Sequence, residues 1–191
     1  GTAQYVPIDE NHLQSPINPY GRSKLMIENI LQDYNIAYDM QYISLRYFNA
    51  AGADIDCEIG EDHDPETHLI PLALDAAIGK IEDIKLFGSD YETNDGSAIR
   101  DYIHVADIAQ AHMLAFEYLE RGGSSDSFNL GNGEGYSVIE IIDAVKRVTK
   151  KDFKVTLRDK RVGDPARLIG DASKAKDILK WKPKYCEIEK I

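Results

Sequence analysis

Two side chains near the start of the chain have the types and the spacing for acid–base chemistry. Tyr20 and Lys24 lie four residues apart in the segment NPYGRSK, directly after Pro19. On a helix this spacing places both side chains on one face, one turn apart. A free phenol is a poor base at neutral pH because its pKa is about 10, but a neighbouring ammonium group stabilises the phenolate. Such a pair can take a proton from a substrate hydroxyl and return it.

Each motif that could carry chemistry also has a plain structural interpretation. The spacing of Tyr20 and Lys24 recurs in many helices as a solvated lysine beside a half-buried tyrosine. Asn49 ends a β-rich segment, where open α/β sheets present ligands, but asparagine also commonly caps turns. In the segment KLFG, Leu86 or Phe87 could lie against a nucleotide base or belong to the core.

The balance of charge makes individual basic residues important. The chain has 22 Lys+Arg and 33 Asp+Glu, a net charge of -11, which does not favour nucleic acids because their binders present a basic face. An acidic chain that binds an anion must use a few placed cations. Arg100 could reach a phosphate with its fork of donors, or pair with Asp101 or Asp107. Arg161 and Asp164 could hold a diphosphate and ribose hydroxyls, or form a local ion pair of little energetic value.

Other features narrow the class of protein. Cys57 and Cys186 match no zinc or CxxC spacing, so we expect reduced, cytosolic cysteines. His63 and His68 lie near each other in an acidic loop, and we expect no metal site there. The sequence contains no signal peptide and no transmembrane run, so we expect a cytoplasmic protein without a membrane partner. Because the chain begins at Gly1 inside what reads as a loop, we expect a fragment or a processed product.

The elements that must position these residues alternate between helices and strands. This alternation predicts an α/β protein with at least part of a parallel sheet. Pro19 suits a first helical turn, and Ser137 with Glu140 forms a capping-box pattern. The segment 49–54 reads as a turn after the first strand. Helices are expected within 15–38, 66–80, 106–123, 137–151 and 171–185, and strands within 40–49, 83–88, 97–105, 126–131 and 153–159.

One glycine motif bears on nucleotide binding. A complete doubly wound nucleotide domain contains an early strand followed by G-x-G-x-x-G. The segment GNGEG at 131–135 has the spacing G-x-G-x-G instead, and we read it as a turn feeding a capped helix. We therefore expect the phosphate-binding half of any Rossmann domain to lie outside this chain.

Together these segments resemble the extended short-chain dehydrogenase/reductase family, and within it the UDP-hexose 4-epimerases. The resemblance implies the C-terminal part of a Rossmann-like doubly wound parallel sheet plus a smaller α/β substrate-binding lobe. Residues 1–60 would end the NAD-binding domain. Residues 61–191 would mainly form the UDP-sugar lobe, with 100–150 returning in part to the Rossmann sheet. The matching stretches are PINPYGRSKLMIE, LRYFNAAGA, HLIPLAL, LFGSDYETNDGSAIRDYIHVADIAQAH, FNLGNGEGYSV and GDPARLIGDASKAKDILKWKPKY.

The resemblance also implies a reaction. NAD would take hydride from C4 of a UDP-glucose or UDP-galactose while the residue matching Tyr20 takes the O4 proton. The resulting 4-keto sugar would turn over, and hydride and proton would return with C4 inverted. Lys24 would bind the nicotinamide ribose, and Phe48 would lie near the nicotinamide.

The same resemblance assigns the substrate contacts. His68 and Leu69 would lie at the diphosphate, and Lys85, Leu86 and Phe87 along the uridine. Leu168 matches a position that controls the size of the sugar pocket, which raises UDP-N-acetylglucosamine as a second substrate. The full substrate set implied is Asn49, His68, Leu69, Lys85, Leu86, Phe87, Arg100, Arg161, Asp164 and Leu168.

Further expectations concern the assembly of the protein, the activity of the chain alone and alternative functions. The helix carrying Tyr20 would pack in a homodimer, and the 191-residue chain alone would be inactive without the rest of the cofactor site. One alternative is another nucleotide-sugar enzyme of the family, a 4,6-dehydratase or a decarboxylase. A dehydratase would need an additional Asp-Glu pair upstream. The other alternative is a non-catalytic nucleotide-sugar-binding module, which would have no need of Tyr20.

Overall fold

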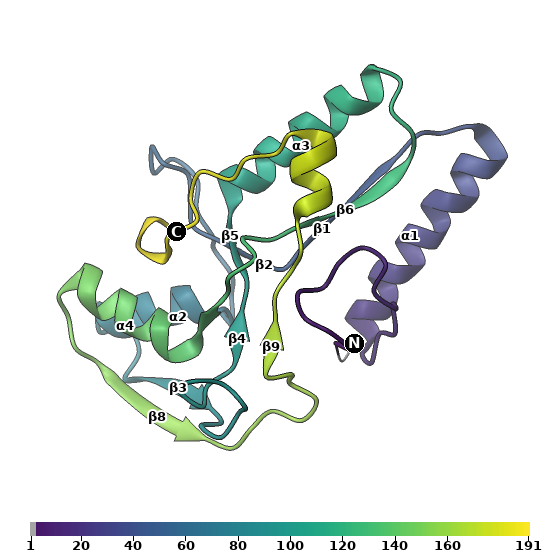
Figure 1. Cartoon of the computed structure of the whole chain (residues 1–191). Coiled ribbons are helices and arrows are strands. Elements are labelled where there is room, and N and C mark those ends of the chain that lie inside the picture. The colour runs from purple at the N-terminus through teal and green to yellow at the C-terminus, as the bar shows by residue number, and fades with distance from the viewer. Residues whose placement is uncertain (1–2) are drawn as a thin grey trace.

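The computed structural model describes residues 3–191 and contains helices on both sides of several short, mainly parallel strands (Figure 1). The helices are α1 (Pro19–Tyr38), α2 (Leu69–Ala77), α3 (Val105–Glu120) and α4 (Val138–Thr149). The strands are β1 (Ile43–Tyr47), β2 (Asn49–Ala51), β3 (Asp83–Phe87), β4 (Ile99–Arg100), β5 (Tyr102–His104), β6 (Asp126–Leu130), β7 (Tyr136–Ser137), β8 (Lys154–Arg158) and β9 (Arg167–Leu168).

The strand pairing confirms the expected α/β class. Strands β1 and β6, β2 and β5, and β3 and β8 pair in parallel. Strand β4 pairs in parallel with β9 and antiparallel with β7. In Figure 1, α1 and α3 accompany the β1–β6 pair, while α2 and α4 cover the β3–β8 pair. The short strands β2, β4, β5 and β9 lie between these two groups.

The expected helix starts are confirmed at two places. Pro19 occupies the first turn of α1, and the Asn18 side chain accepts a hydrogen bond from the Gly21 N–H at 2.7 Å. The capping box of α4 is complete, because Ser137 Oγ accepts from the Glu140 N–H and Glu140 Oε2 accepts from the Ser137 N–H. Helix α1 begins at residue 19 rather than 15, since the residue before a proline favours an extended backbone.

Two elements differ from the expectation. The strand expected over 40–49 breaks at Phe48, and residues 49–51, expected in a turn, form β2 instead. They do so because β2 has β5 as a parallel partner, a pairing that local sequence does not reveal. The helix expected within 171–185 is reduced to a π-helical segment at Ala175–Leu179, which ends at Lys180 in the left-handed conformation.

Three hydrophobic clusters hold the elements together. One joins α3 to β1 and β6 and contains Phe128 and Trp181, both fully buried. A second joins α2 and α4 to β3, and a third, around Ile141 and Tyr102, shares Leu69 with the second. Segments within 100–150 therefore contribute to both groups of elements. The assignment of these groups to a cofactor domain and a sugar lobe remains a prediction.

The final segment of the chain is anchored on α3. The indole N–H of Trp181 donates to the Asp107 carbonyl at 2.9 Å. The buried Asp107 carboxylate accepts from the backbone N–H groups of Lys184 and Tyr185, each at 2.9 Å. Asp107, expected as a possible partner of Arg100, therefore has a structural role instead. Within residues 3–191 the structure contains no helix with the length and apolar character that a membrane crossing requires.

Helix α1 is attached to the rest of the molecule by polar contacts. None of its residues is buried. Arg46 of β1 donates from Nε to Glu28 of α1 at 2.8 Å, and Gln14 donates to the same carboxylate. Burial alone would raise the pKa of Glu28, but the hydrogen bonds from Arg46 and Gln14 outweigh it and hold that pKa below its ordinary value. This ion pair orients the helix that carries Tyr20.

We expect Glu28→Gln to lower the free energy of unfolding by about 1–3 kcal/mol at pH 7, because Arg46 loses a charged partner. The folded-state pKa is lowered, so the contribution of Glu28 is complete above the ordinary value of 4.5 and is lost as pH falls through the folded value. The difference from the parent should therefore shrink below that pH. Urea unfolding of both proteins across this range measures it, with Asp33→Asn, at an exposed position of the same helix, as the control. A pH-independent difference would contradict the assignment.

Candidate functional site

Two adjoining clefts contain most of the candidate residues. The first cleft has a volume of about 1010 Å³ and is lined by parts of α2, β3, β4 and the loop around Arg161. The second has a volume of about 680 Å³ and includes Tyr20, Phe48 and Val105. The clefts share a wall and therefore adjoin. The shared wall consists of Asn49, Ala50, Ala51, Gly52, Ala53, Gly60, Glu61 and His68.

The second cleft contains the candidate acid–base group. Tyr20 lines it with 72% of its surface exposed, so a ligand hydroxyl could reach the phenol. The Lys24 ammonium nitrogen lies 5.2 Å from the centre of the Tyr20 ring. The four-residue spacing therefore brings the pair together on one face of α1, as the sequence predicts.

Phe48 lines the second cleft, and the position of its ring requires a glycine at residue 170. A Cβ atom at residue 170 would lie 2.3 Å from a carbon of the Phe48 ring. Glycine at this position therefore allows the ring to pack against the backbone beyond β9. Asn49, the next residue, begins β2 and lines both clefts.

The first cleft contains an arginine–aspartate pair. Arg100 contacts the Asp164 carboxylate with one terminal nitrogen and donates to its neighbouring Ile99 carbonyl with the other, at 2.6 Å. The partner of Arg100 is therefore Asp164 rather than Asp101 or Asp107. The Tyr91 hydroxyl lies 3.5 Å from the same carboxylate, and burial, followed by the Asp164 charge, raises the pKa of Tyr91. Both members of the pair line the cleft.

Arg161 and Phe87 pack against each other in the lining of the first cleft. The Arg161 guanidinium carbon lies 4.0 Å from the centre of the Phe87 ring, a cation–π distance. Lys85 is exposed on the same strand and lines the cleft, whereas Leu86 is buried and is not among the lining residues. Side chains alternate along β3, so Lys85 and Phe87 lie on one face of the strand and Leu86 on the other.

Leu69 and Leu168 differ in their relation to the clefts. Leu69 begins α2, lines the first cleft and packs against two of the hydrophobic clusters. Leu168 lies on β9 in register with Arg100 and lines neither cleft. Its assignment to a sugar pocket remains a prediction.

One lining residue was not singled out from the sequence. Tyr102 lies in β5, is 5% exposed and lines the first cleft. Burial raises its pKa to about 12, so its phenol stays protonated at neutral pH and is unsuited as a base. Tyr20, in contrast, is exposed in the second cleft. No local motif marks Tyr102, since its position depends on the β2–β5 pairing.

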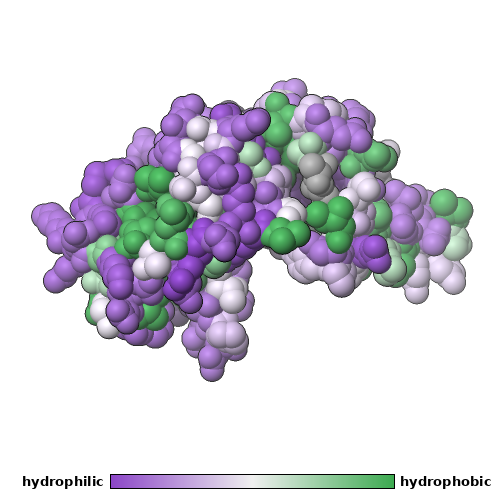
Figure 2. All heavy atoms as spheres, turned by 90° about the horizontal axis from the view of Figure 1, so that it is seen from below, coloured by the Kyte–Doolittle hydropathy of each residue, from purple (hydrophilic) through white to green (hydrophobic). Residues whose placement is uncertain are grey.

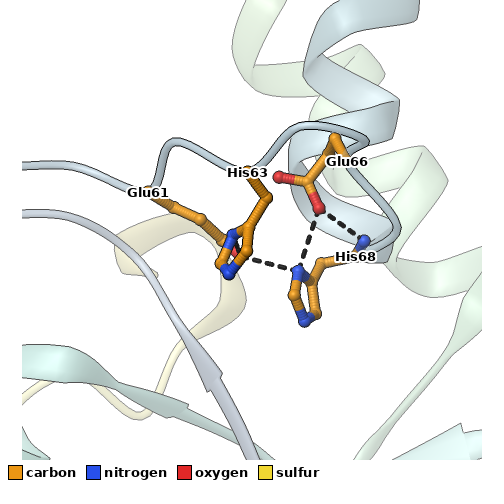
Figure 3. A group of neighbouring side chains, drawn as sticks. All are labelled: Glu61, His63, Glu66 and His68. Carbon is orange, nitrogen blue, oxygen red and sulfur yellow. Dashed lines mark hydrogen bonds and ion pairs between the residues drawn. The ribbon is translucent and has the colours of Figure 1, made fainter.

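The loop before α2 brings together a group that the sequence did not predict. His68 precedes the first residue of α2 and lines both clefts. Its Nδ1 atom lies 2.6 Å from Glu61 and 2.9 Å from Glu66, and Glu61 also contacts His63 (Figure 3). We expected no metal site at His63 and His68, yet four potential ligands converge there.

Comparison with known proteins places the chain in a family. The model of the NAD dependent epimerase/dehydratase family matches residues 1–131, well over half of the chain. The chain belongs to this family. A UDP-glucose 4-epimerase of Rhizobium meliloti (strain 1021) is 50% identical over 185 residues, which are 97% of this chain and 56% of that protein.

Solved structures agree with this family assignment. A UDP-glucose 4-epimerase from Brucella ovis in complex with NAD has a TM-score of 0.97 and 49% identity, and the match covers 100% of this chain and 59% of that one. The enzyme from Bifidobacterium longum in complex with NAD+ and UDP has a TM-score of 0.90 and 36% identity, covering 100% and 57%. The expected resemblance and the Rossmann-like fold class are confirmed. The chain spans somewhat more than half the length of these relatives.

In this epimerase/dehydratase chain, the buried residue Asp101 binds several segments beside the clefts through its carboxylate and its backbone. Its oxygens accept hydrogen bonds from the backbone N–H groups of Asn132 at 2.8 Å, Gly133 at 3.2 Å and Gly170 at 3.1 Å. The Asp101 backbone accepts from Asn49 at 3.0 Å and donates to Leu168 at 3.1 Å. The glycine motif at 131–135 is thus a turn, as expected, and its N–H groups bind an internal carboxylate.

We expect Asp101→Ala to lower the free energy of unfolding by about 3 kcal/mol, because three backbone N–H groups, of which that of Gly170 is buried, would lose their acceptor. Urea unfolding measures this loss. Asp159→Ala, an exposed aspartate, is the control and should change stability by less than about 0.5 kcal/mol. Burial raises the pKa of Asp101, so Asp101→Asn should lose less than the alanine variant. An alanine variant as stable as the parent would show that the carboxylate does not organise this turn.

Proposed function

We propose that the protein is a UDP-glucose 4-epimerase, which interconverts UDP-glucose and UDP-galactose through a 4-keto sugar with bound NAD. One observation carries the proposal: the two clefts adjoin, and their walls combine Tyr20 in the second cleft, Arg100 and Arg161 over Phe87 in the first, and His68 in both. These groups match the three parts of a UDP-hexose, namely the reacting sugar, the diphosphate and the base. The family assignment and the similar solved structures support the same conclusion.

The second cleft has the chemistry to receive the nicotinamide end of NAD. Phe48 and the alanines of β2 offer an apolar wall beside Tyr20, and Lys24 offers ammonium donors for ribose hydroxyls. NAD, when bound, supplies a hydride acceptor and donor for C4 of the sugar. We assign Tyr20, Lys24 and Phe48 to this end of the cofactor.

Tyr20 moves the proton. As a phenolate it takes the O4 proton of the sugar, and the nearby Lys24 ammonium stabilises the charge before this transfer. The phenol then returns the proton once the 4-keto sugar has presented its other face. Because C4 is inverted, the same phenol must exchange a proton with O4 before and after the sugar turns its other face to the cofactor. An exposed side chain in a cleft suits this requirement.

The UDP end supplies the binding energy. We assign the base to Phe87 and Arg161, with backbone contacts from Lys85 and Leu86 along β3. Arg161 and Arg100 provide cations for a dianionic diphosphate in an otherwise acidic chain.

Residues next to these groups would make the remaining contacts with the substrate. Asp164 would accept ribose hydroxyls, and His68 and Leu69 would lie at the phosphates. Asn49 would contact the sugar, which must turn over and therefore needs few tight contacts. The wall of Ala50, Ala51, Gly52 and Ala53 shared by the clefts supports this, because small side chains leave room for rotation.

The first test uses the full-length gene product with UDP-galactose and no added reductant. We expect Tyr20→Phe to lower the rate of UDP-glucose formation by about 10²–10⁴-fold, because the variant cannot accept the O4 proton. Bound NAD should remain in the variant. Tyr38→Phe, on the exposed far end of the same helix, is the matched control and should retain the parent rate.

Other outcomes separate the rival functions. If NAD is bound but neither sugar is epimerised, the proposal of an epimerase fails and a 4,6-dehydratase or decarboxylase is favoured. UDP binding that is indifferent to Tyr20, without turnover, would favour a non-catalytic binding module. We also expect the 191-residue chain alone to be inactive, and we propose turnover of UDP-N-acetylglucosamine through Leu168, which an assay with that sugar tests.

A second test addresses the UDP end. We expect Arg161→Ala to weaken UDP binding at least about tenfold, because a charged, stacked contact is worth more than about 1.4 kcal/mol. Isothermal titration of UDP into the full-length protein measures this. Arg167→Ala removes the same charge nearby from a residue that lines neither cleft, and should change the affinity little. Equal losses in the two variants would indicate general charge attraction rather than a base and phosphate site.

We further propose a homodimer and a cytoplasmic role in galactose metabolism. Apolar side chains exposed on α1, including Met26, Ile27 and Ile30, support packing of this helix against a partner copy. Figure 2 shows hydrophobic side chains gathered in several patches on one face of the molecule. Free, exposed Cys57 and Cys186 agree with a reducing compartment.

A further inference from the structure

Four side chains of one loop converge on a common point beside the clefts. One ligand atom each from Glu61, His63, Glu66 and His68 lies within 4.8 Å of the others. Figure 3 shows these side chains turned toward one another from the segment that leads into α2. The two histidine side chains are about half exposed, while those of Glu61 and Glu66 are 25% and 13% exposed. The group is therefore open to solvent mainly on its histidine side.

The imidazole hydrogens are too few for the contacts within this group. Glu61 Oε1 lies 2.9 Å from His63 Nδ1 and 2.6 Å from His68 Nδ1, and Glu66 Oε1 lies 2.9 Å from His68 Nδ1. Each Nδ1 carries at most one hydrogen, so the two atoms cannot donate separately in all three contacts. His68 Nδ1 faces two carboxylate oxygens with a single donor, so the imidazole hydrogens cannot account for all three contacts.

Glu66 is already ordered as a carboxylate. Its Oε1 accepts from the backbone N–H groups of Thr67 at 2.6 Å and His68 at 2.7 Å. The carboxylate is thus held in place by its own hydrogen bonds, as metal-ligating carboxylates are.

We propose that Glu61, His63, Glu66 and His68 bind one divalent transition-metal ion of the zinc class. Two imidazoles and two carboxylates form a mixed nitrogen and oxygen set, which suits Zn²⁺ and its neighbours and is unlike the all-oxygen sets of Mg²⁺ and Ca²⁺. A tetrahedral ion about 2.1 Å from each ligand atom separates those atoms by about 3.4 Å. The contacts of 2.6–2.9 Å and the outer limit of 4.8 Å bracket that separation, so small side-chain rotations suffice.

The ion would order the loop at the junction of the two clefts. His68 and Glu61 line both clefts, and His68 directly precedes α2. Coordination through Nδ1 places the remaining proton of the His68 ring on Nε2, which then is a hydrogen-bond donor. The metal site itself does not depend on the proposed function, because its four ligands all belong to this loop.

The test uses full-length protein without a histidine tag, freed of metal by chelator and dialysis. Titration with Co²⁺ should produce visible absorption bands of a low-symmetry, four-coordinate ion, saturating at one ion per chain. Competition between Zn²⁺ and a chromophoric chelator then gives the affinity. We expect His63→Gln and Glu61→Gln each to weaken Zn²⁺ binding at least about tenfold, since even outer-shell changes cost about 10–100-fold.

Matched controls separate a built site from a merely acidic loop. Glu58→Gln and Asp62→Asn remove charges from the same loop but no ligand of the group, and His12→Gln removes a histidine elsewhere. All three should retain the parent Zn²⁺ affinity, and circular dichroism should show that every variant is folded. The proposal is overturned if Co²⁺ produces no such bands, if His63→Gln binds Zn²⁺ as tightly as the parent, or if the loop controls lose as much affinity as the ligand variants.

Discussion

The burial of one carboxylate, Asp101, is the constraint on which the site depends. Its side chain holds the turn after β6 and the backbone beyond β9, while its own backbone bonds to Asn49 and Leu168. The residue before it is Arg100 and the residue after it begins β5. A single buried carboxylate, held by three backbone N–H groups, thus fixes three separate segments against one another. The arginine beside it remains available to the cleft.

This arrangement explains what the sequence could and could not predict. Features governed by residues within one turn of each other are predictable, such as Pro19 at the start of α1 and the Ser137–Glu140 capping box. The break at Phe48 and the formation of β2 were not, because they depend on β5, about fifty residues later. The turn at 131–135 was recognised as a turn, but its ligand, Asp101, was not recognisable from local spacing.

The same distinction applies to the candidate site. Tyr20 and Lys24 are neighbours on one helix, so their proximity could be predicted from spacing. The contact of Arg100 with Asp164 joins residues 64 positions apart, and the sequence left the partner of Arg100 open among other aspartates. Glu61 and Glu66 were overlooked because carboxylates in an acidic loop are ordinarily solvated. Only the folded path of the loop turns them toward the two histidines.

The electrostatics of the first cleft follow from the charge of the whole chain. With a net charge of -11, the surface repels a diphosphate at long range, so attraction has to come from groups at close range. The Arg100 side chain is 12% exposed and already faces the Asp164 carboxylate, which reduces the desolvation cost of keeping a guanidinium at the cleft wall. A phosphate that approaches Arg100 must share its guanidinium group with the Asp164 carboxylate. The guanidinium group of Arg161, in contrast, stacks on the ring of Phe87 rather than on an anion. The two arginines therefore differ in kind: Arg100 is a preorganised, partly neutralised contact, and Arg161 supplies the less compensated charge.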